Sequence, residues 1–277
     1  MPELPEVETM RRGILGVVGS TIKEVVFPSS KYKPIRIHPT KKKFKSKAEG
    51  RTIESIDRIA KRVLVRLDSA DTLVFEPRMT GLVLVSDPPN RIHLRCGFFL
   101  ENDETPELWF WDRRGLGSVK LVSEKELSVE LGEDRIGPDA LIIVADELRD
   151  RLRKSDRMIK VALLDQKVVA GIGNLYASEL LYVAGIHPEK KCRLLSKTQW
   201  AAIIEATRSV LNQAIKHEGS TLSDGTYRNA LNQTGSYQNH HRVYDRKGLP
   251  CFHCGGEIIR RVHAQRSTFF CKTCQRR

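Results

Sequence analysis

Apolar and polar residues follow two different patterns along this chain of 277 residues. In the first half, short segments either alternate between apolar and polar side chains or are continuously apolar, with Gly, Pro or Asp between them. Such segments are typical of β-strands separated by turns. The predicted strands are 21–26, 62–68, 72–75, 81–85, 93–100, 107–111 and 118–122. A series of short strands of this kind predicts a β-sandwich or a β-barrel.

A helix is predicted ahead of these strands, over Pro5–Ile14. Proline suits the first turn of a helix, where its missing N–H is not needed. Glu6 and Glu8 place negative charge at the positive end of the helix dipole, and Val7 and Met10 recur at helical spacing. The chain is therefore expected to begin with a helix that has one packing face.

From about Gly137 the apolar spacing becomes helical, with helices predicted over 145–154, 157–166, 175–184 and 196–217. In the last of these, Ser196 and Gln199 fit a capping box, and one apolar stripe follows. The sequence thus predicts an α+β protein in three parts. These are an N-terminal β-sandwich domain with a leading helix (1–136), a helical domain (137–239) and a small cysteine module (240–277).

Hydrophobic residues make up 40% of the chain, which is enough for folded domains. No apolar run is long enough to span a membrane, and the first residues are acidic, unlike those of a secretory signal. We therefore expect a cytoplasmic protein that does not act at a membrane.

Positive charge is in excess and is clustered. The chain has 47 Lys and Arg against 34 Asp and Glu, a formal net charge of +13. Residues 31–51 hold nine Lys or Arg and one acid, and residues 242–277 hold nine against two acids. Clusters of this kind suit the phosphate backbone of a nucleic acid. The alternative is a basic surface that only contacts solvent.

Four of the six cysteines form two CxxC pairs, Cys251 with Cys254 and Cys271 with Cys274, separated by sixteen residues. This spacing predicts a closed, structural four-thiolate zinc site, carried by a β-hairpin too small to fold without its metal. Paired redox cysteines are the alternative. The zinc signal by itself says little about function.

The segment 163–188 reads as a helix, a glycine-punctuated turn and a second helix. Gly171 and Gly173 permit close backbone approach, and Asn174 is placed to cap a helix that begins at Leu175. A helix N-terminus offers free amides to an anion, so a phosphate is one possible ligand. An ordinary helix hairpin with a plain cap explains the same residues.

Three motifs together resemble the formamidopyrimidine-DNA glycosylase branch of the Fpg/Nei family. They are PELPEVE after Met1, the segment GIGNLYASE that leads to GIHP (171–188), and HAQRSTFFCKTCQ (263–275). They stand at the start, middle and end of the chain, in the order of the family. The related endonuclease VIII branch typically begins PEGPE, so Leu4 favours the first branch.

The resemblance implies a β-sandwich followed by a helix–two-turn–helix domain and a zinc finger with one structural zinc. It also implies a monomeric bifunctional DNA glycosylase and AP lyase of base excision repair that acts on damaged double-stranded DNA. The expected substrates are oxidised purines, namely 8-oxoguanine and formamidopyrimidines. Once Met1 is removed, Pro2 would be the nucleophile through its secondary amine, whose pKa near ~8 leaves a useful unprotonated fraction at neutral pH.

The same resemblance assigns roles to further residues. Glu3 is the expected general acid/base, and Glu6 is expected to orient the terminus. Lys61, in the segment RIAK, is the expected proton donor for β-elimination and a phosphate contact. Asn174 and Arg266 are the expected phosphate contacts, with Arg266 also assigned to δ-elimination. Without the resemblance, Glu6 could serve only the helix dipole, and Lys61 could be a solvated surface lysine.

A glycosylase that extrudes its target must fill the hole left in the duplex. By similarity Met79 is the void-filling wedge and Arg113 faces the orphaned base. Two departures from the family stand here: the usual HLGMSG is EPRMTG, and DPRRFG is DRRGLG, so the wedge phenylalanine is absent and Leu116 is only a partial substitute. These changes place opposite-base preference and lesion range in question.

Two alternatives remain beside an enzyme of oxidised purines. One is a non-catalytic protein of the same fold that only binds damaged DNA. The other is a glycosylase directed at oxidised pyrimidines. The intact Pro2-Glu3 pair favours an enzyme, because a binding protein does not need it. The loop expected to contact the damaged base lies within 219–239.

Overall fold

The structure is a computed structural model that describes residues 2–276. The chain forms two compact units: residues up to Gly132 with Ile215–Gln238, and Glu133–Ala214 with Asn239–Arg277. The segment that follows the last long helix therefore belongs with the N-terminal part. The predicted division into three domains at 136 and 239 remains a prediction.

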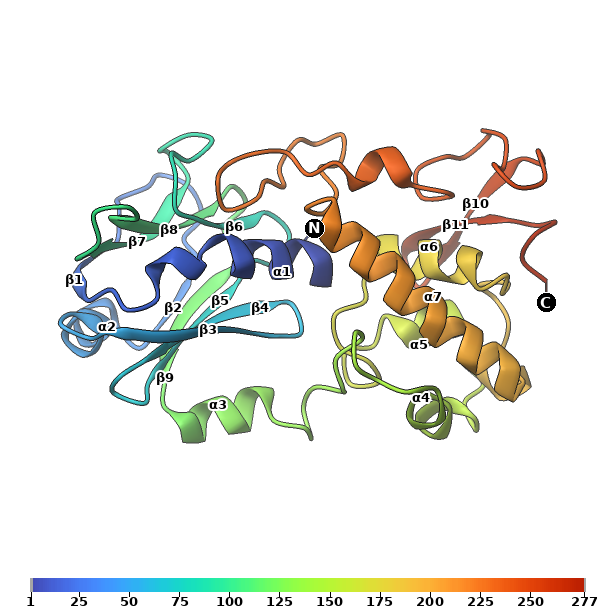
Figure 1. The fold of residues 1–277 in the computed structure, drawn as a ribbon, viewed down its shortest axis with the longest axis horizontal. Coiled ribbons are helices and arrows are strands. Elements are labelled where there is room, and N and C mark those ends of the chain that lie inside the picture. Colours follow the sequence, from blue (N-terminus) through green and yellow to red (C-terminus); the bar gives the residue numbers. More distant parts are fainter. Residues whose placement is uncertain (1, 277) are drawn as a thin grey trace. The chain divides into compact units, whose positions relative to one another are not determined.

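The first unit contains two β-sheets (Figure 1). The four-stranded sheet has the order β1 (Ile22–Val26), β7 (Leu94–Leu100), β8 (Glu107–Asp112) and β6 (Gly81–Leu84). The five-stranded sheet has the order β2 (Arg36–His38), β9 (Ser118–Val122), β5 (Thr72–Glu76), β4 (Arg62–Leu67) and β3 (Ile53–Ile59). Every pair is antiparallel except β2 and β9, which run parallel.

Buried side chains from both sheets form one hydrophobic core. Phe75 of β5 lies between Phe98 of β7 and Phe110 of β8, with ring centroids 5.9 Å apart in each pair. Ring contacts of this kind across two facing sheets are the core of a sandwich. The predicted α+β class and the β-sandwich are confirmed.

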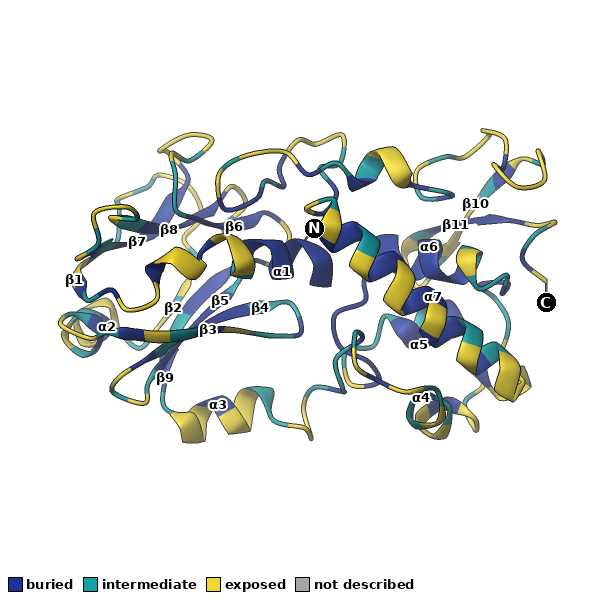
Figure 2. Ribbon diagram, in the orientation of Figure 1, coloured by how far each residue is buried: buried dark blue, intermediate teal, exposed yellow. Residues whose placement is uncertain are grey.

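The leading helix α1 (Leu4–Gly13) contacts β3 and β4 of one sheet and β6 of the other. Val7 and Met10 are fully buried in the common core, as their spacing predicted. Figure 2 shows that the first turns of α1 are buried and its C-terminal end is exposed. The start of the chain is therefore part of the folded core.

Four helices and strands of this unit were not predicted: β2, β3, α2 (Lys41–Ala48) and α3 (Glu124–Leu131). The helix α2 lies within the basic run 31–51 and buries only Phe44 and Ala48. Leu127 of α3 packs on Leu64, Val74 and Val122, on the five-stranded sheet. Short 3-10 turns occur at Leu15–Val17, Cys192–Leu194 and Tyr237–His240.

The second unit contains the remaining helices and a hairpin: α4 (Ala145–Leu152), α5 (Ile159–Leu163), α6 (Asn174–Val183), α7 (Lys197–Lys216), β10 (Ile258–His263) and β11 (Arg266–Cys271). The last turn of α7 passes into the first unit. Ser196 and Gln199 bond to each other's backbone N–H at 3.1 and 3.2 Å, which confirms the capping box.

The predicted helix over 157–166 is shorter, because α5 ends at Leu163. The Asp165 carboxylate accepts the N–H of Lys167 at 3.0 Å, which favours a turn at this point. Gln166 then bonds to Gly171 and Ile172 across the two turns that lead to α6. Among residues 2–276, no helix is long and apolar enough to cross a membrane.

Candidate functional site

The predicted nucleophile and its partners stand at the first turn of α1. Pro2 directly precedes Glu3, the N-cap of the helix, and Pro2, Glu3 and Glu6 are all buried. The Glu6 carboxylate accepts the backbone N–H of Glu3 at 2.9 Å. This capping interaction fixes the direction in which the chain enters the helix. Met1, whose removal would expose the Pro2 amine, lies outside the described residues.

The Glu6 carboxylate also holds the segment that follows α7. Its Oε1 accepts the N–H of Ser220 at 2.9 Å. Gly219 has a φ of +79°, and a Cβ there would lie 2.9 Å from Glu6 Cγ, so only glycine fits. Tyr227 is buried beside it and donates to the Glu218 carbonyl at 2.9 Å. The start of the chain and the loop 219–239 are therefore joined through one carboxylate.

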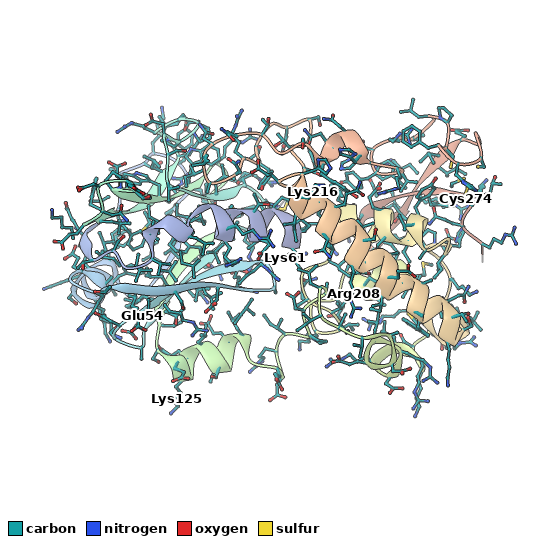
Figure 3. All side chains as sticks on the ribbon, viewed as in Figure 1. Glu54, Lys61, Lys125, Arg208, Lys216 and Cys274 are labelled. Carbon is teal, nitrogen blue, oxygen red and sulfur yellow. The ribbon has the colours of Figure 1, made fainter. Side chains whose placement is uncertain are left out.

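Lys61 lies in the two-residue turn between β3 and β4, where Ile59 pairs with Arg62 (Figure 3). The turn is held by Arg58, which donates to the Ala60 carbonyl at 3.0 Å. Arg58 also pairs with the Glu8 carboxylate of α1 at 3.1 Å. The helix that follows Pro2 and the turn that carries Lys61 are thus linked by one ion pair.

Glu8 is almost buried, with 9% of its side chain exposed, and accepts hydrogen bonds from Arg11 and Arg12 as well. Burial raises the pKa of the Glu8 carboxyl. The hydrogen bonds from Arg11 and Arg12 and the charges of Arg11 and Arg58 outweigh this, so the pKa falls to about 2. The link to Arg58 is therefore charged at any physiological pH.

Met79 and Arg113 lie on two neighbouring turns of the first unit. Met79 is 37% exposed and Arg113 is also exposed. The turns are tied together by the buried Asp112, whose carboxylate accepts the Thr80 hydroxyl at 2.5 Å and the Gly117 N–H at 2.8 Å. The turns that carry Met79, the predicted wedge, and Arg113, predicted to face the orphaned base, are thus held next to each other.

In the second unit, Asn174 is the first residue of α6 and not its cap. Gly173 is the N-cap, so the prediction that Asn174 caps a helix beginning at Leu175 is wrong. The Asn174 side chain instead donates to the Ser267 carbonyl at 2.9 Å and accepts a hydrogen bond from Lys160 Nζ. Gly173 is the N-cap, so the Asn174 side chain is not needed to cap the helix. It joins α6 to the β10–β11 hairpin instead.

Arg266 is the exposed first residue of β11 and follows a turn made by Ala264 and Gln265, with φ of 45° and 60°. His263, its partner across the hairpin, bonds to Thr268 at 2.9 Å and to Glu189 at 3.0 Å. Because Ser267 bonds to Asn174, the two predicted phosphate contacts lie close together.

Sequence reasoning missed Lys160 and Glu179. Lys160 is fully buried, and its Nζ donates to Asn174 and to the Ser267 carbonyl. Glu179 of α6 is also fully buried, and its carboxylate accepts the N–H groups of residues 242–244 at 2.8–2.9 Å. Burial raises the pKa of Glu179, against the effect of these hydrogen bonds. A charged residue within an apolar stretch of α6 was a signal for such a role.

The four predicted cysteines meet at the base of the β10–β11 hairpin. Their Sγ atoms all lie within 4.8 Å of one another, and the Cys251–Cys274 and Cys254–Cys271 pairs are 3.8 and 3.4 Å apart. A tetrahedral zinc with Zn–S bonds of about 2.3 Å needs sulfur atoms roughly 3.8 Å apart. The donor set and its spacing fit one structural zinc, as predicted.

Comparison with known sequence families finds three matches in order along the chain. Residues 1–119 match the formamidopyrimidine-DNA glycosylase N-terminal domain, 136–226 the formamidopyrimidine-DNA glycosylase H2TH domain, and 248–277 the zinc finger found in FPG and IleRS. The chain belongs to the formamidopyrimidine-DNA glycosylase family. The resemblance read from the three sequence motifs is confirmed.

Relatives in this family match over nearly the whole chain. The formamidopyrimidine-DNA glycosylase of Chloroflexus aggregans is 41% identical, over 99% of this chain and 98% of its own. The crystal structure of the MutM (Fpg) protein of Thermus thermophilus has a TM-score of 0.86 at 38% identity and covers 99% and 98% of the two chains. A complex of Lactococcus lactis Fpg with DNA that contains an abasic site has a TM-score of 0.87 at 32% identity, covering 99% and 100%.

The Glu8 ion pairs predict a specific pH dependence of stability. The folded-state pKa of about 2 lies below the ordinary value of 4.5, so Glu8 stabilises the protein above about pH 4.5 and loses this effect as the pH falls towards 2. We expect Glu8→Gln to lower the free energy of unfolding by about 2 kcal/mol at pH 7. The difference from wild type should shrink to nothing near pH 2.

Urea denaturation at pH 7, 5, 4, 3 and 2 measures this difference. Glu54→Gln is the control, because Glu54 is an exposed carboxylate on β3. A Glu8→Gln effect of the same size at every pH would show that the charge of Glu8 contributes nothing.

Removal of zinc should weaken DNA binding by the second unit, because the β10–β11 hairpin depends on the metal for its structure. Without the metal, Arg266 and the Ser267 carbonyl that holds Asn174 lose their positions. The loss of two charge-assisted contacts predicts a fall in affinity for abasic-site DNA on the order of a hundredfold. Fluorescence anisotropy before chelation, after chelation and after zinc is restored measures it. Tight binding by zinc-free protein would contradict this role of the hairpin.

Proposed function

We propose that this chain is a bifunctional DNA glycosylase and AP lyase of base excision repair, with oxidised purines as substrates and Pro2 as the nucleophile. The observation that carries the proposal is the first turn of α1, where the buried Glu6 carboxylate holds the N–H of Glu3 and so fixes the residue before it. A protein that only binds DNA has no need for a terminus fixed in this way.

The chemistry begins at the amine of Pro2 after Met1 is removed. Its lone pair attacks C1′ of the damaged nucleotide, and the bond from C1′ to the base breaks, with the electron pair leaving on the base. Glu3 takes the proton that the Pro2 nitrogen loses and gives it to the sugar ring oxygen as the bond from C1′ to that oxygen breaks. Because Pro2 is a secondary amine, the product is a cationic iminium, which withdraws electrons from the sugar.

The iminium makes strand cleavage possible. It acidifies the proton at C2′, whose removal breaks the C3′–O bond in β-elimination, and a second elimination breaks the C5′–O bond. Lys61 is assigned to proton transfer in the first elimination and Arg266 to the second. The link from Glu8 through Arg58 to the Lys61 turn supports the first assignment, because it ties that turn to the helix of the nucleophile.

DNA binding is assigned to residues of both units. Asn174 and Arg266 bind phosphate, supported by their shared contact at Ser267. Met79 fills the space left by the extruded nucleotide and Arg113 faces the orphaned base, supported by the Asp112 tether between their turns. The loop 219–239, held to Glu6 through Ser220, contacts the damaged base. We infer that the protein is a monomer and works in the cytoplasm, where its DNA substrate lies.

Two solved complexes of one relative guide the choice of lesion. Lactococcus lactis Fpg forms these complexes with DNA that contains Fapy-dG and with DNA that contains an abasic site, and the two chains are 31% and 32% identical to this chain. The residues around Met79 and Leu116 that depart from the family pattern affect which lesions the protein accepts. A panel of lesion substrates therefore decides between oxidised purines and the alternative of oxidised pyrimidines.

The test is borohydride trapping and base release on duplexes with 8-oxoguanine, a formamidopyrimidine, thymine glycol or an abasic site. We expect release and covalent capture with both purine lesions, capture with the abasic site, and slower reaction with thymine glycol. An extra glycine before Pro2 turns its nitrogen into an amide and should lower the rate by about a thousandfold or more. The same glycine added at the C-terminus is the matched control.

Each other outcome has a distinct meaning. Binding without capture on any duplex would leave only a damage-binding protein. Faster release of thymine glycol than of both purines would move the substrate class to oxidised pyrimidines. Full activity of the form with the extra glycine would remove Pro2 as nucleophile.

A further inference from the structure

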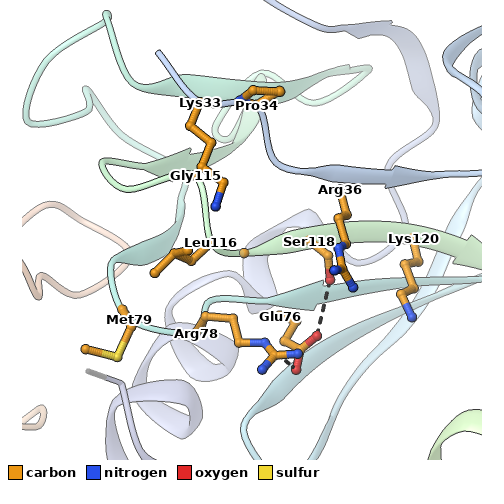
Figure 4. A pocket seen from close by; sticks show the side chains of 11 residues that line it. Lys33, Pro34, Arg36, Glu76, Arg78, Met79, Gly115, Leu116, Ser118 and Lys120 are labelled. Carbon is orange, nitrogen blue, oxygen red and sulfur yellow. Dashed lines mark hydrogen bonds and ion pairs between the residues drawn. The ribbon is translucent and has the colours of Figure 1, made fainter.

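A pocket of about 500 Å³ lies in the first unit beside Met79 (Figure 4). Its basic lining residues come from three separate segments: Lys33 ahead of β2 with Arg36 at its start, Arg78 after β5, and Lys120 on β9. Met79 and Leu116, which are 37% and 38% exposed, add apolar surface. Four cations and an apolar border make this a site for an anion next to a flat, apolar group.

The single carboxylate of the pocket is already used by the protein. Glu76 has 15% of its side chain exposed, and it pairs with Arg62 at 2.8 Å and with Arg78 at 3.0 Å. It also accepts the Ser118 hydroxyl at 3.3 Å. Because these partners occupy Glu76, the field that reaches a ligand in the pocket is positive.

The walls of the pocket are held by backbone contacts. Gly115 has a φ of +61°, and a Cβ there would lie 2.1 Å from the Lys33 carbonyl oxygen, so the two segments touch through their backbones. The Arg36 N–H donates to the Gly117 carbonyl at 3.3 Å. The cations therefore project from a fixed frame, as a binding site requires.

Arg78 is the unusual residue of this pocket. Its φ is +54°, in the left-handed region that disfavours residues with a Cβ. Its side chain is 57% exposed, and its Nε pairs with Glu76 Oε1 at 3.0 Å. Residues held in a strained backbone conformation cluster at functional sites.

We propose that this pocket is a phosphodiester subsite for the DNA beside the wedge, with Arg78 as its bidentate donor. A guanidinium fork matches two phosphate oxygens, while Lys33, Arg36 and Lys120 supply the surrounding positive field. Arg78 directly precedes Met79, so the phosphate would lie beside the nucleotide that Met79 displaces. The proposal rests on the proposed function, because it requires that the chain bind damaged duplex DNA.

The test is Arg78→Gly with a duplex that carries a stable abasic-site analogue. Loss of one phosphate contact should raise the Kd about tenfold and lower the slope of log K against log salt by about one unit. Glycine also relieves the left-handed backbone, so the melting temperature should rise. A protein that melts higher but binds less tightly cannot be explained by misfolding.

Two matched controls separate backbone from charge. Ala70→Gly relieves another left-handed residue, with φ +61°, in a turn outside the pocket, and should raise the melting temperature with binding unchanged. Arg91→Gln removes an 80% exposed charge outside the pocket and should leave Kd within about twofold of wild type. Arg78→Lys keeps the charge but not the fork and should fall between wild type and Arg78→Gly.

The contact itself is located by a neutral methylphosphonate placed at one phosphate at a time around the lesion. At one position wild type should lose about tenfold in affinity while Arg78→Gly loses nothing further. If no position shows this coupling, the proposal is overturned. It is also overturned if inorganic phosphate raises the melting temperature of wild type but not of Arg78→Gly while the DNA salt slopes are equal, because the pocket would then hold only the free anion.

The experiments distinguish failure of the phosphodiester subsite from failure of the proposed function. Wild type that neither binds nor is trapped on any lesion duplex contradicts both. Wild type that is trapped normally, with Arg78→Gly unchanged in Kd and salt slope, contradicts the subsite alone.

Discussion

The two hydrogen bonds that the Glu6 carboxylate accepts from the backbone are the interaction on which the rest of the first unit's site depends. Glu6 is 2% exposed and accepts the N–H groups of Glu3 and Ser220, which are more than 200 residues apart in sequence. A buried carboxylate that satisfies two backbone donors is costly to disturb, because either donor would be left without its partner. The first residues of the chain, which are disordered in many proteins, are therefore held in place.

In the second unit, a metal site and a buried cation hold the β10–β11 hairpin in place. The hairpin β10–β11 is short, so four thiolates and one zinc must supply the stability that its small core lacks. Lys160 and Asn174 then bond to Ser267, beside Arg266. Burying a lysine is unfavourable unless its charge is satisfied, so these partners fix the lysine and the strand at the same time.

Much of this could be predicted from sequence because the signals were local. The strands alternate, the cysteines have zinc spacing, and the three family motifs sit at the start, middle and end. Some elements were missed because their local signal was weak: α2 shows only two buried residues within a basic run, and a register shift between Ile53 and Ser55 breaks the alternation of β3. The role of Lys160 depends on partners 14 and 107 residues away. The cap at Gly173 was misassigned because Asn174 is itself a good capping residue.

The central claim is that the amine of the second residue attacks the sugar, and peptide mapping of the trapped complex tests it most directly. The protein is captured with borohydride on a lesion duplex, digested with nuclease and protease, and its peptides are sequenced by tandem mass spectrometry. The account predicts a peptide that begins at Pro2 without Met1 and carries the reduced sugar remnant on its nitrogen. A remnant on Lys61 or another lysine, with Met1 still attached, would contradict the account.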